Sequence, residues 1–437
     1  MQRDASLRRS GRPSVATRLA TLRVAMTCFV LTLSIIYLSF LYSFASVMRN
    51  QGNVETSNSD SNNNDAKLRS VSTVNRDSSA SGTPHTYTEW RKLATDLAKL
   101  PPSELLDTLQ RQDPFGVRAI EHAIRNAPKE RTLEELLPDI ETVFTCPPVE
   151  ERLSFPDQRD ADKAQSYRNH DEGTFIFFQH LRKAGGTNVC SLATANLPKK
   201  HLPPYYCMPD YYWHHANENI QSGTNGCAGC LHHWSNQEIM EKIGRYWIAG
   251  NEWDSFDPTR HLDLPAVFVT SFRRPLDRAV SQFRFECLEN RGCKFKEIEL
   301  WWEHRRDLYN VYTWTFADVR QQSRLATSTN TKDIQKRSEA VGVALDVIMQ
   351  FHVIMVMEYL RFASPLVEHV LGFTDTSVLT HHVRPHNGQI QRQDSLIPKE
   401  YLSAEQYKRM SETLALDEIL TDAAQRLFWE RLLCKTY

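Results

Sequence analysis

The chain has 437 residues and a formal net charge of −1, and 41% of its residues are hydrophobic. That length accommodates one large domain or two ordinary ones with additional segments, and the apolar fraction is ample for a buried core. Proteins that bind nucleic acids usually carry an excess of basic residues, and this chain does not, so we expect no nucleic acid among its partners.

The first predicted element is an apolar segment near the N-terminus. Residues 24–48 carry no charge, and as a helix they would span about 37 Å, enough to cross a hydrocarbon core of about 30 Å. Residues 1–23 are rich in arginine, so the positive-inside rule predicts a cytosolic tail, a signal-anchor and a lumenal remainder. A cleaved signal peptide is the alternative, with Ser43-Phe44-Ala45 as the cleavage site, although its apolar core would be unusually long.

The cysteines agree with a lumenal or extracellular compartment. An even number of them beyond the apolar segment suits disulfides, although the sequence does not define which cysteines pair. Cys287 and Cys293 are spaced to close a short loop. The cluster Cys227-Ala-Gly-Cys230-Leu-His232-His233 leaves a zinc site open, but it lacks a second well-spaced pair, so disulfides are favoured. The cysteines beyond the segment are Cys146, Cys190, Cys207, Cys227, Cys230, Cys287, Cys293 and Cys434.

Two further segments precede the main domain. Residues 49–85 are rich in Ser, Asn, Asp and Thr, so they cannot bury enough apolar surface to offset the entropy of ordering. They are predicted to form a disordered stem. Residues 86–165 begin with apolar side chains at helical spacing, as at Trp90, Leu93 and Leu97, and are predicted to form a helical preamble. The sequence indicates no function for this preamble.

Short apolar runs alternate with helical stretches across residues 170–437. Continuous apolar strands separated by helices indicate an α/β domain with a central parallel sheet flanked by helices. The predicted strands are Thr174–Phe178, Tyr246–Ala249, Ala266–Phe272 and Val353–Met357. The predicted helices are Asn188–Asn196, Leu276–Phe285, Lys336–Met349, Tyr359–Leu371 and one that a capping box opens at Ser403 and that runs toward Leu416.

A glycine-bearing loop follows the first predicted strand and opens a helix. Glycines let backbone N–H groups approach an anion closely, and the helix N-terminus adds partial positive charge. Lys183 adds a full charge and Thr187 a hydroxyl, so a phosphate or sulfate cradle is predicted. An ordinary glycine turn is the alternative. The loop lacks the Walker A order, in which lysine follows the glycines, and it reads Phe178-Gln-His180-Leu-Arg182-Lys183-Ala-Gly185-Gly186-Thr187-Asn188.

A second charged motif, Arg273-Arg274-Pro275, follows the third predicted strand. Because proline is pre-organised for the first helical position, a helix is expected to start there. Arg273 then lies at the carboxyl edge of the sheet, where ligands bind in open α/β sheets, and Ser281 lies two turns into the helix. A guanidinium and a hydroxyl suit a terminal phosphate. The alternative is a surface helix whose arginines pair with Asp277 and neighbouring acids.

The two motifs together resemble the 5′-phosphosulfate loop and the 3′-phosphate motif of membrane-bound Golgi carbohydrate sulfotransferases of the heparan sulfate O-sulfotransferase type. Those motifs read His-x-x-Lys-Thr-Gly-Gly-Thr and Arg-Asp-Pro-x-x-Arg-x-x-Ser. The resemblance covers roughly residues 170–435, including a late strand that leads to Glu358 and a closing helix, Asp417–Phe428. It implies a P-loop NTPase-like sulfotransferase fold, a type II protein of the Golgi membrane, and a glycan or glycoconjugate as acceptor.

The resemblance also implies that 3′-phosphoadenosine 5′-phosphosulfate (PAPS) is the cosubstrate and that no metal is required. The residues implied to bind PAPS are Lys183, Gly185, Gly186 and Thr187 at the 5′-phosphosulfate, with Arg182 and Asn188 in the same loop, and Arg273 and Ser281 at the 3′-phosphate. The sequence departs from the family pattern at Arg182, Ala184 and Arg274, where proline, threonine and aspartate are common. These departures remove no phosphate-binding group, and they leave the acceptor unassigned.

Two other classes remain open. A Golgi glycosyltransferase would share the anchor and stem, and Asp160-Ala-Asp162 matches the letters of its metal site, although the charged neighbours indicate a surface loop. A non-catalytic, adhesive lumenal protein is the other alternative. The presence of Lys183, Arg273 and Ser281 in one chain argues against it.

A glycan hydroxyl is a poor nucleophile, so a positioned general base is expected. We predict Glu252, which follows the second predicted strand and leaves the sheet at the same edge as both motifs. His180 is the second candidate, and its position more naturally shapes the loop. Trp253 would shield the Glu252 carboxylate and raise its pKa. A capping or salt-bridged glutamate is the alternative, and His232 and His233 are further candidates.

Overall fold

The computed structural model describes residues 86–126, 131–148, 175–203, 207, 237, 241, 245–252, 266–289, 292–317, 323–380 and 397–434. All of them belong to one compact unit, residues 81–437. The predicted tail, anchor and stem, and the cluster from Cys227 to His233, lie outside the described residues. Within the described part of the chain, no helix has both the length and the apolar character to span a bilayer.

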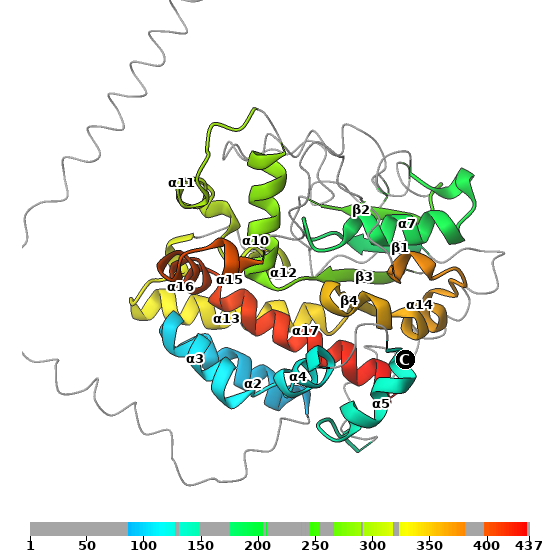
Figure 1. Ribbon diagram of the computed structural model, residues 1–437, viewed down its shortest axis with the longest axis horizontal. Coiled ribbons are helices and arrows are strands. Elements are labelled where there is room, and N and C mark those ends of the chain that lie inside the picture. The colour runs from blue at the N-terminus through cyan, green and yellow to red at the C-terminus, as the bar shows by residue number, and fades with distance from the viewer. Residues whose placement is uncertain are drawn as a thin grey trace, which may run out of the picture. The chain divides into compact units, whose positions relative to one another are not determined.

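A parallel sheet forms the centre of the described unit (Figure 1). Its strands are β1 (Phe175–Gln179), β2 (Ile248–Asn251), β3 (Ala266–Phe272) and β4 (Val353–Val356), in the order β2-β1-β3-β4. Nearly every strand residue is buried, as expected for a parallel sheet covered on both faces. The predicted α/β class and central parallel sheet are confirmed. β2 begins two residues later than predicted, and Trp247, just before it, stacks on His201.

Helices occupy most of the rest of the described unit. Beyond the preamble they are α7 (Gly186–Asn196), α10 (Pro275–Phe283), α11 (Ile298–His304), α12 (Val311–Phe316), α13 (Thr331–Ile348), α14 (Ser364–Leu371), α15 (Pro398–Tyr401), α16 (Ala404–Thr413) and α17 (Ala415–Cys434). The shorter helices are η3 (Lys199–His201), η7 (Arg306–Leu308), η8 (Ser323–Leu325), η9 (Met357–Phe362) and η10 (Ser377–Thr380), which are 3-10 helices, and the π-helix η6 (Arg284–Leu288).

Two predicted helices are divided in the structure. The segment predicted as one helix over Tyr359–Leu371 is η9 followed by α14, because Pro365 lacks the N–H that a continuous helix needs and suits a helix's first turn. The helix expected from Ser403 toward Leu416 ends at Thr413, and α17 begins at Ala415. The predicted capping box at Ser403 is present.

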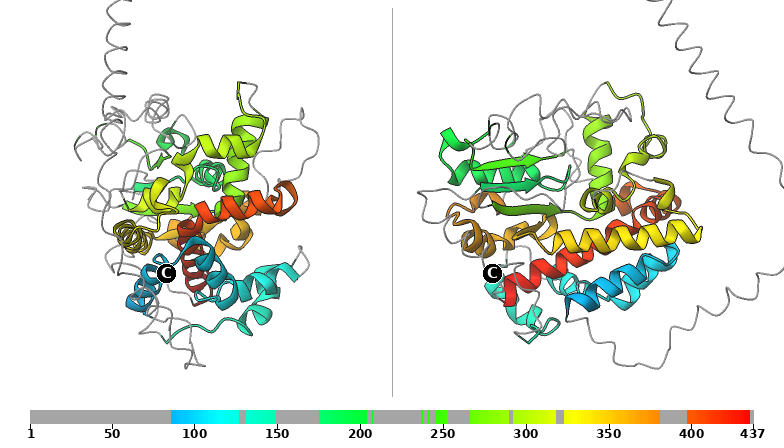
Figure 2. Two further views of the ribbon diagram at one scale, coloured as in Figure 1. Left: turned by 90° about the vertical axis from the view of Figure 1, so that its left-hand side faces the viewer. Right: turned by 180° about the vertical axis from the view of Figure 1, so that it is seen from behind.

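The described residues of the preamble form helices that pack against the domain. Its helices are α2 (Tyr87–Leu97), α3 (Pro102–Gln112), α4 (Arg118–Asn126) and α5 (Leu133–Glu141). α2 packs against α13, and α3 packs against α17, which in turn packs against β4 (Figure 2). The preamble is therefore an integral layer of the unit, and its buried side chains in the shared core include Trp90, Leu97, Leu105 and Leu109.

Three disulfides join the described cysteines, which confirms the predicted use of cysteine. Cys287–Cys293 closes the short loop that their spacing indicated, and Cys190–Cys207 ties α7 to the segment beside β2. Cys146–Cys434 ties the end of the preamble to the end of α17, across 288 residues.

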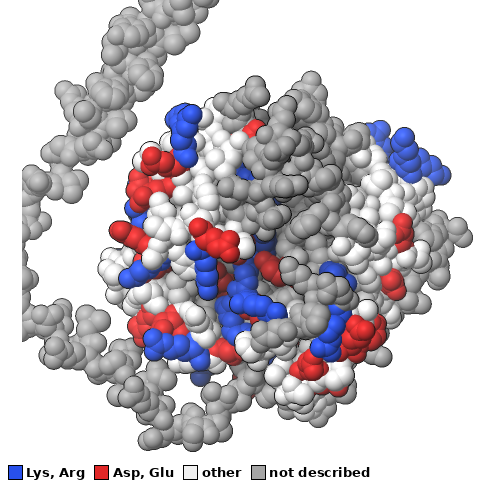
Figure 3. Space-filling model, viewed as in Figure 1, with Lys and Arg blue, Asp and Glu red and all other residues white. Residues whose placement is uncertain are grey.

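On the face shown in Figure 3, basic side chains gather near the centre and acidic side chains lie among and around them.

Candidate anion-binding site

The strand order places a topological switch point at the carboxyl end of β1. The chain passes from β1 to β2 on one side, and from β3 to β4 on the other. The loops after β1 and β3 therefore diverge, and such switch points are where open α/β sheets bind ligands. Each predicted site segment follows a strand at this edge: Gly185–Asn188 follows β1, Glu252 follows β2 and Arg273 follows β3. The structure thus gathers the predicted loop, base candidate and arginine on one side of the sheet.

A buried polar layer closes this edge beneath the loops. Asn251 Nδ2 donates to Gln179 Oε1 at 3.2 Å, and Thr270 Oγ1 donates to the Gln179 carbonyl at 3.0 Å. The His180 N–H in turn donates to the Asn251 carbonyl at 2.9 Å. Residues 180–185, which connect β1 to α7, are called the β1 loop. These hydrogen bonds fix the start of the β1 loop relative to Glu252. Neither Gln179 nor Asn251 was among the predicted site residues.

The β1 loop has the backbone of an anion cradle. Lys183 and Gly185 both have positive φ, at 65° and 101°. Within the described residues, the N–H groups of Gly185, Gly186 and Thr187 bond to no other protein group. Such N–H groups at a helix N-terminus favour an anion.

Close packing explains both glycines of the loop. A Cβ on Gly185 would lie 2.3 Å from Met357 Sδ, and one on Gly186 would lie 1.7 Å from His180 Nε2. The His180 ring also stacks on Phe178, with ring centroids 5.2 Å apart. His180 therefore packs between β1 and the first turn of α7, which favours a role in shaping the loop.

The two sequence motifs meet directly, although they lie 90 residues apart in the chain. Arg273 Nη1 donates to the Lys183 carbonyl at 3.4 Å, and Tyr312 Oη donates to the Arg273 carbonyl at 2.9 Å. Lys183 Nζ lies 4.3 Å from the ring centroid of Phe285, just past the end of α10. Phe285 thus contacts the first motif and Tyr312 the second, and neither belonged to the predicted site.

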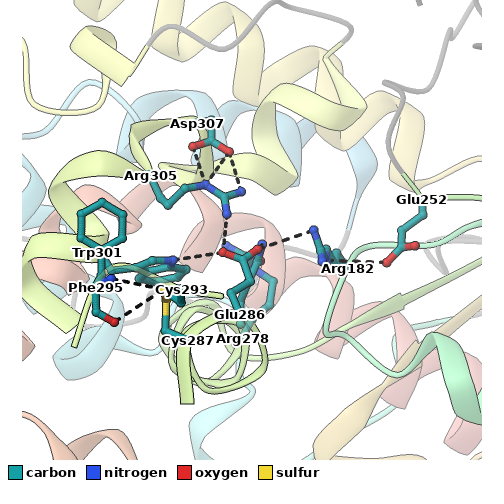
Figure 4. Close-up of polar contacts among 11 residues, drawn as sticks. Arg182, Glu252, Arg278, Glu286, Cys287, Cys293, Phe295, Trp301, Arg305 and Asp307 are labelled. Atoms are coloured by element: carbon teal, nitrogen blue, oxygen red, sulfur yellow. Dashed lines mark hydrogen bonds and ion pairs between the residues drawn. A yellow bond between two sulfur atoms is a disulfide. The ribbon is translucent and has the colours of Figure 1, made fainter. Parts of the chain in front are cut away.

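Arg182 bridges two carboxylates beside the loop (Figure 4). Its Nε lies 3.9 Å from Glu252 Oε1, and its Nη1 lies 3.6 Å from Glu286 Oε1. Glu252 is therefore largely buried and lies beside a guanidinium. Whether it also serves as the base stays a prediction.

Glu286 is the most firmly held of these groups. It accepts hydrogen bonds from Gln282 Nε2 at 2.9 Å and Trp301 Nε1 at 3.0 Å, and it pairs closely with Arg305. Burial alone would raise the pKa of Glu286, but Arg305, Gln282 and Arg182 outweigh it, so the pKa is lowered. Glu286 is thus a fixed anion that anchors Arg182.

The remaining predicted residues lie on α7 and α10. Within the described part of the chain, the hydroxyls of Thr187 and Ser281 have no protein hydrogen-bonding partner. Asn188 instead donates its side-chain amide to the Val378 carbonyl at 3.5 Å. Burial raises the pKa of Asp277, although Arg273 and Arg274 oppose this.

Comparison with protein-family models, with curated proteins and with solved structures finds no match to this chain. Among the described residues, no three His, Cys, Asp or Glu side chains are grouped to hold a metal ion. The candidate site consists of backbone N–H groups, a lysine and an arginine around one edge of a parallel sheet.

Proposed function

We propose that this edge binds PAPS and that the protein transfers its sulfuryl group to a hydroxyl of a glycan, as a carbohydrate O-sulfotransferase of the Golgi lumen anchored through residues 24–48. The observation that carries the proposal is the contact between Arg273 and the Lys183 carbonyl. It puts an anion cradle and a second cationic group, from distant parts of the chain, at one switch point. A donor with two separate phosphate groups requires such a pair of sites.

The residues present fit such a donor. The N–H groups of Gly185, Gly186 and Thr187, with Lys183, would hold the 5′-phosphosulfate, because helix N-termini and lysine both favour anions. Arg273 and the Ser281 hydroxyl would hold the 3′-phosphate by charge-assisted and neutral hydrogen bonds.

Catalysis of sulfuryl transfer mainly requires that the reactants are positioned and that developing charge is stabilised. The acceptor oxygen attacks sulfur, the bond from sulfur to the bridging phosphate oxygen breaks, and adenosine 3′,5′-bisphosphate leaves with the electron pair. Phosphoryl transfer is the closest analogy. Lys183 would stabilise the charge that develops on the leaving phosphate, and Glu252 would accept the proton of the hydroxyl. Arg182 would orient the Glu252 carboxylate.

The proposal is tested by Lys183→Ala and Arg273→Ala in a transfer assay with sulfate-labelled PAPS and a panel of glycans. Each variant is expected to lose about 1.5–3 kcal/mol of donor or transition-state binding, the usual value of a hydrogen bond to a charged group. Lys199→Ala is the matched control, because Lys199 is exposed beyond the far end of α7. Full activity in either folded variant of the first pair would contradict the assignment.

A further inference from the structure

The preamble reaches the candidate site through α4. Glu121 on α4 is 7% exposed, and its Oε1 pairs closely with Arg274 Nη2. Arg274 immediately follows Arg273 and is the N-cap residue of α10. A carboxylate from the segment with no assigned role is therefore in contact with the loop that presents the proposed 3′-phosphate ligand.

α4 itself is fixed at its start. The Asp113 carboxylate accepts the N–H groups of Val117, Arg118 and Ala119 at 2.9, 3.0 and 3.2 Å. Arg118 Nη2 donates to Asp422 Oδ2 on α17 at 2.7 Å, and Asp422 is 1% exposed. Breaking a buried pair of this kind is strongly unfavourable. Glu121 is thus presented from a rigid support.

The loop between β3 and α10 consists of Arg273 and Arg274 alone, and few contacts define it. Tyr312 Oη holds the Arg273 carbonyl, and Glu358 Oε1 accepts the Arg274 N–H at 3.0 Å. Glu121 holds the Arg274 side chain. Asp277, Glu418 and Asp422 also influence Arg274 electrostatically, but among the described residues only Glu121 forms an ion pair with its guanidinium.

We infer that Glu121 is a positioning residue for 3′-phosphate recognition: it holds Arg274 so that the adjacent Arg273 guanidinium stays directed toward the Lys183 loop. This inference rests on the proposed function. It gives the preamble a role in donor selectivity, since Glu121 acts on the 3′-phosphate end of the donor and not on the 5′ end.

Two effects of Glu121 have opposite signs, and two conservative variants separate them. Its negative charge weakens the attraction of nearby phosphate, whereas its contact with Arg274 orders the loop. Glu121→Asp keeps the charge and shortens the side chain, so the contact is lost. Glu121→Gln removes the charge and keeps the length, so the contact with Arg274 is retained. Positioning predicts loss of binding for the first variant and near-normal binding for the second.

The experiment is calorimetric titration of the full chain with adenosine 3′,5′-bisphosphate and with adenosine 5′-monophosphate, which differ only in the 3′-phosphate. Glu121→Asp should bind the bisphosphate about tenfold more weakly, with the monophosphate unchanged, and Glu121→Gln should stay within about threefold of the wild type. Glu134→Asp, at an exposed position of α5, is the control and should change neither affinity.

Unchanged bisphosphate binding by Glu121→Asp, equal losses for both nucleotides, or a larger loss in Glu121→Gln would overturn the inference. Failure of the proposed function is visible separately, on the wild type alone. A wild-type chain with no preference for the bisphosphate over the monophosphate would overturn the 3′-phosphate assignment and this inference together.

Discussion

Gly185→Ala is the substitution whose effect follows most directly from the structure. Gly185 has a φ of 101°, and a Cβ there would lie 2.3 Å from Met357 Sδ. Left-handed backbone costs a residue with a Cβ about 1–2 kcal/mol. Overpacking adds about 1–3 kcal/mol, here at the low end because a methionine side chain adapts readily. The expected loss in the free energy of unfolding is therefore about 2–3 kcal/mol, with weakened PAPS binding because the loop must shift.

Guanidinium chloride unfolding of the purified chain measures this loss, and Gly342→Ala is the matched control. Gly342 lies inside α13 without positive φ, and its Cβ would meet Arg91 Nη2 and Thr95 Cγ2 at 3.1 Å. Alanine gains about 1 kcal/mol of helix propensity there, which offsets the tight contacts. A Gly185→Ala chain that unfolds at the wild-type denaturant concentration and binds PAPS normally would refute this account of the loop.

Three further predictions concern the disulfides, a buried acid and the base. Cys146→Ser should lower the free energy of unfolding by roughly 5 kcal/mol and Cys287→Ser by roughly 2 kcal/mol, because the two disulfides close loops of 288 and 6 residues. Equal losses for the two variants in denaturant unfolding would contradict this. Burial, and then Asp422, raise the pKa of Glu418 to about 7. The raised pKa means that the folded state binds the Glu418 proton more tightly than the unfolded state does. Glu418 therefore stabilises the fold below about pH 4, and this stabilisation is lost as the pH rises through 7. The free energy of unfolding of Glu418→Gln, measured by thermal unfolding, should therefore rise by about 1–3 kcal/mol relative to that of the wild type between pH 4 and pH 8. A difference between the two proteins that does not change with pH would exclude this cause. Glu252→Gln should bind PAPS normally while turnover falls about 10²-fold, and unchanged turnover would move the base to a histidine such as His180.

The sheet and the β1 loop could be predicted because their signals are local. Four continuous apolar runs define the strands, and Pro275 marks the start of α10 at the end of β3. The paired glycines predicted a tight turn into a helix, and the structure shows positive φ at Gly185. Parallel strands share a carboxyl edge, so Glu252 and Arg273 were expected on one side of the sheet.

The supporting contacts could not be predicted because they join residues that are distant in sequence. Glu121 pairs with Arg274 across more than 150 residues, and helical periodicity shows only which face of α4 is apolar. In the sequence, Tyr312 and Phe285 look like ordinary core aromatics. In the structure, Tyr312 contacts Arg273 and Phe285 contacts Lys183. The pairing of Cys146 with Cys434 likewise depends on the packing of the preamble, which composition alone does not specify.

Equilibrium binding of PAPS to the purified chain tests most directly whether the carboxyl edge of β1 binds a sulfated nucleotide. The measurement is made with and without manganese, beside a panel of sugar nucleotides. We expect PAPS to bind without a metal ion, and we expect Lys183→Ala to weaken that binding. Binding of a sugar nucleotide only with manganese, and no binding of PAPS, would contradict it and favour glycosyl transfer.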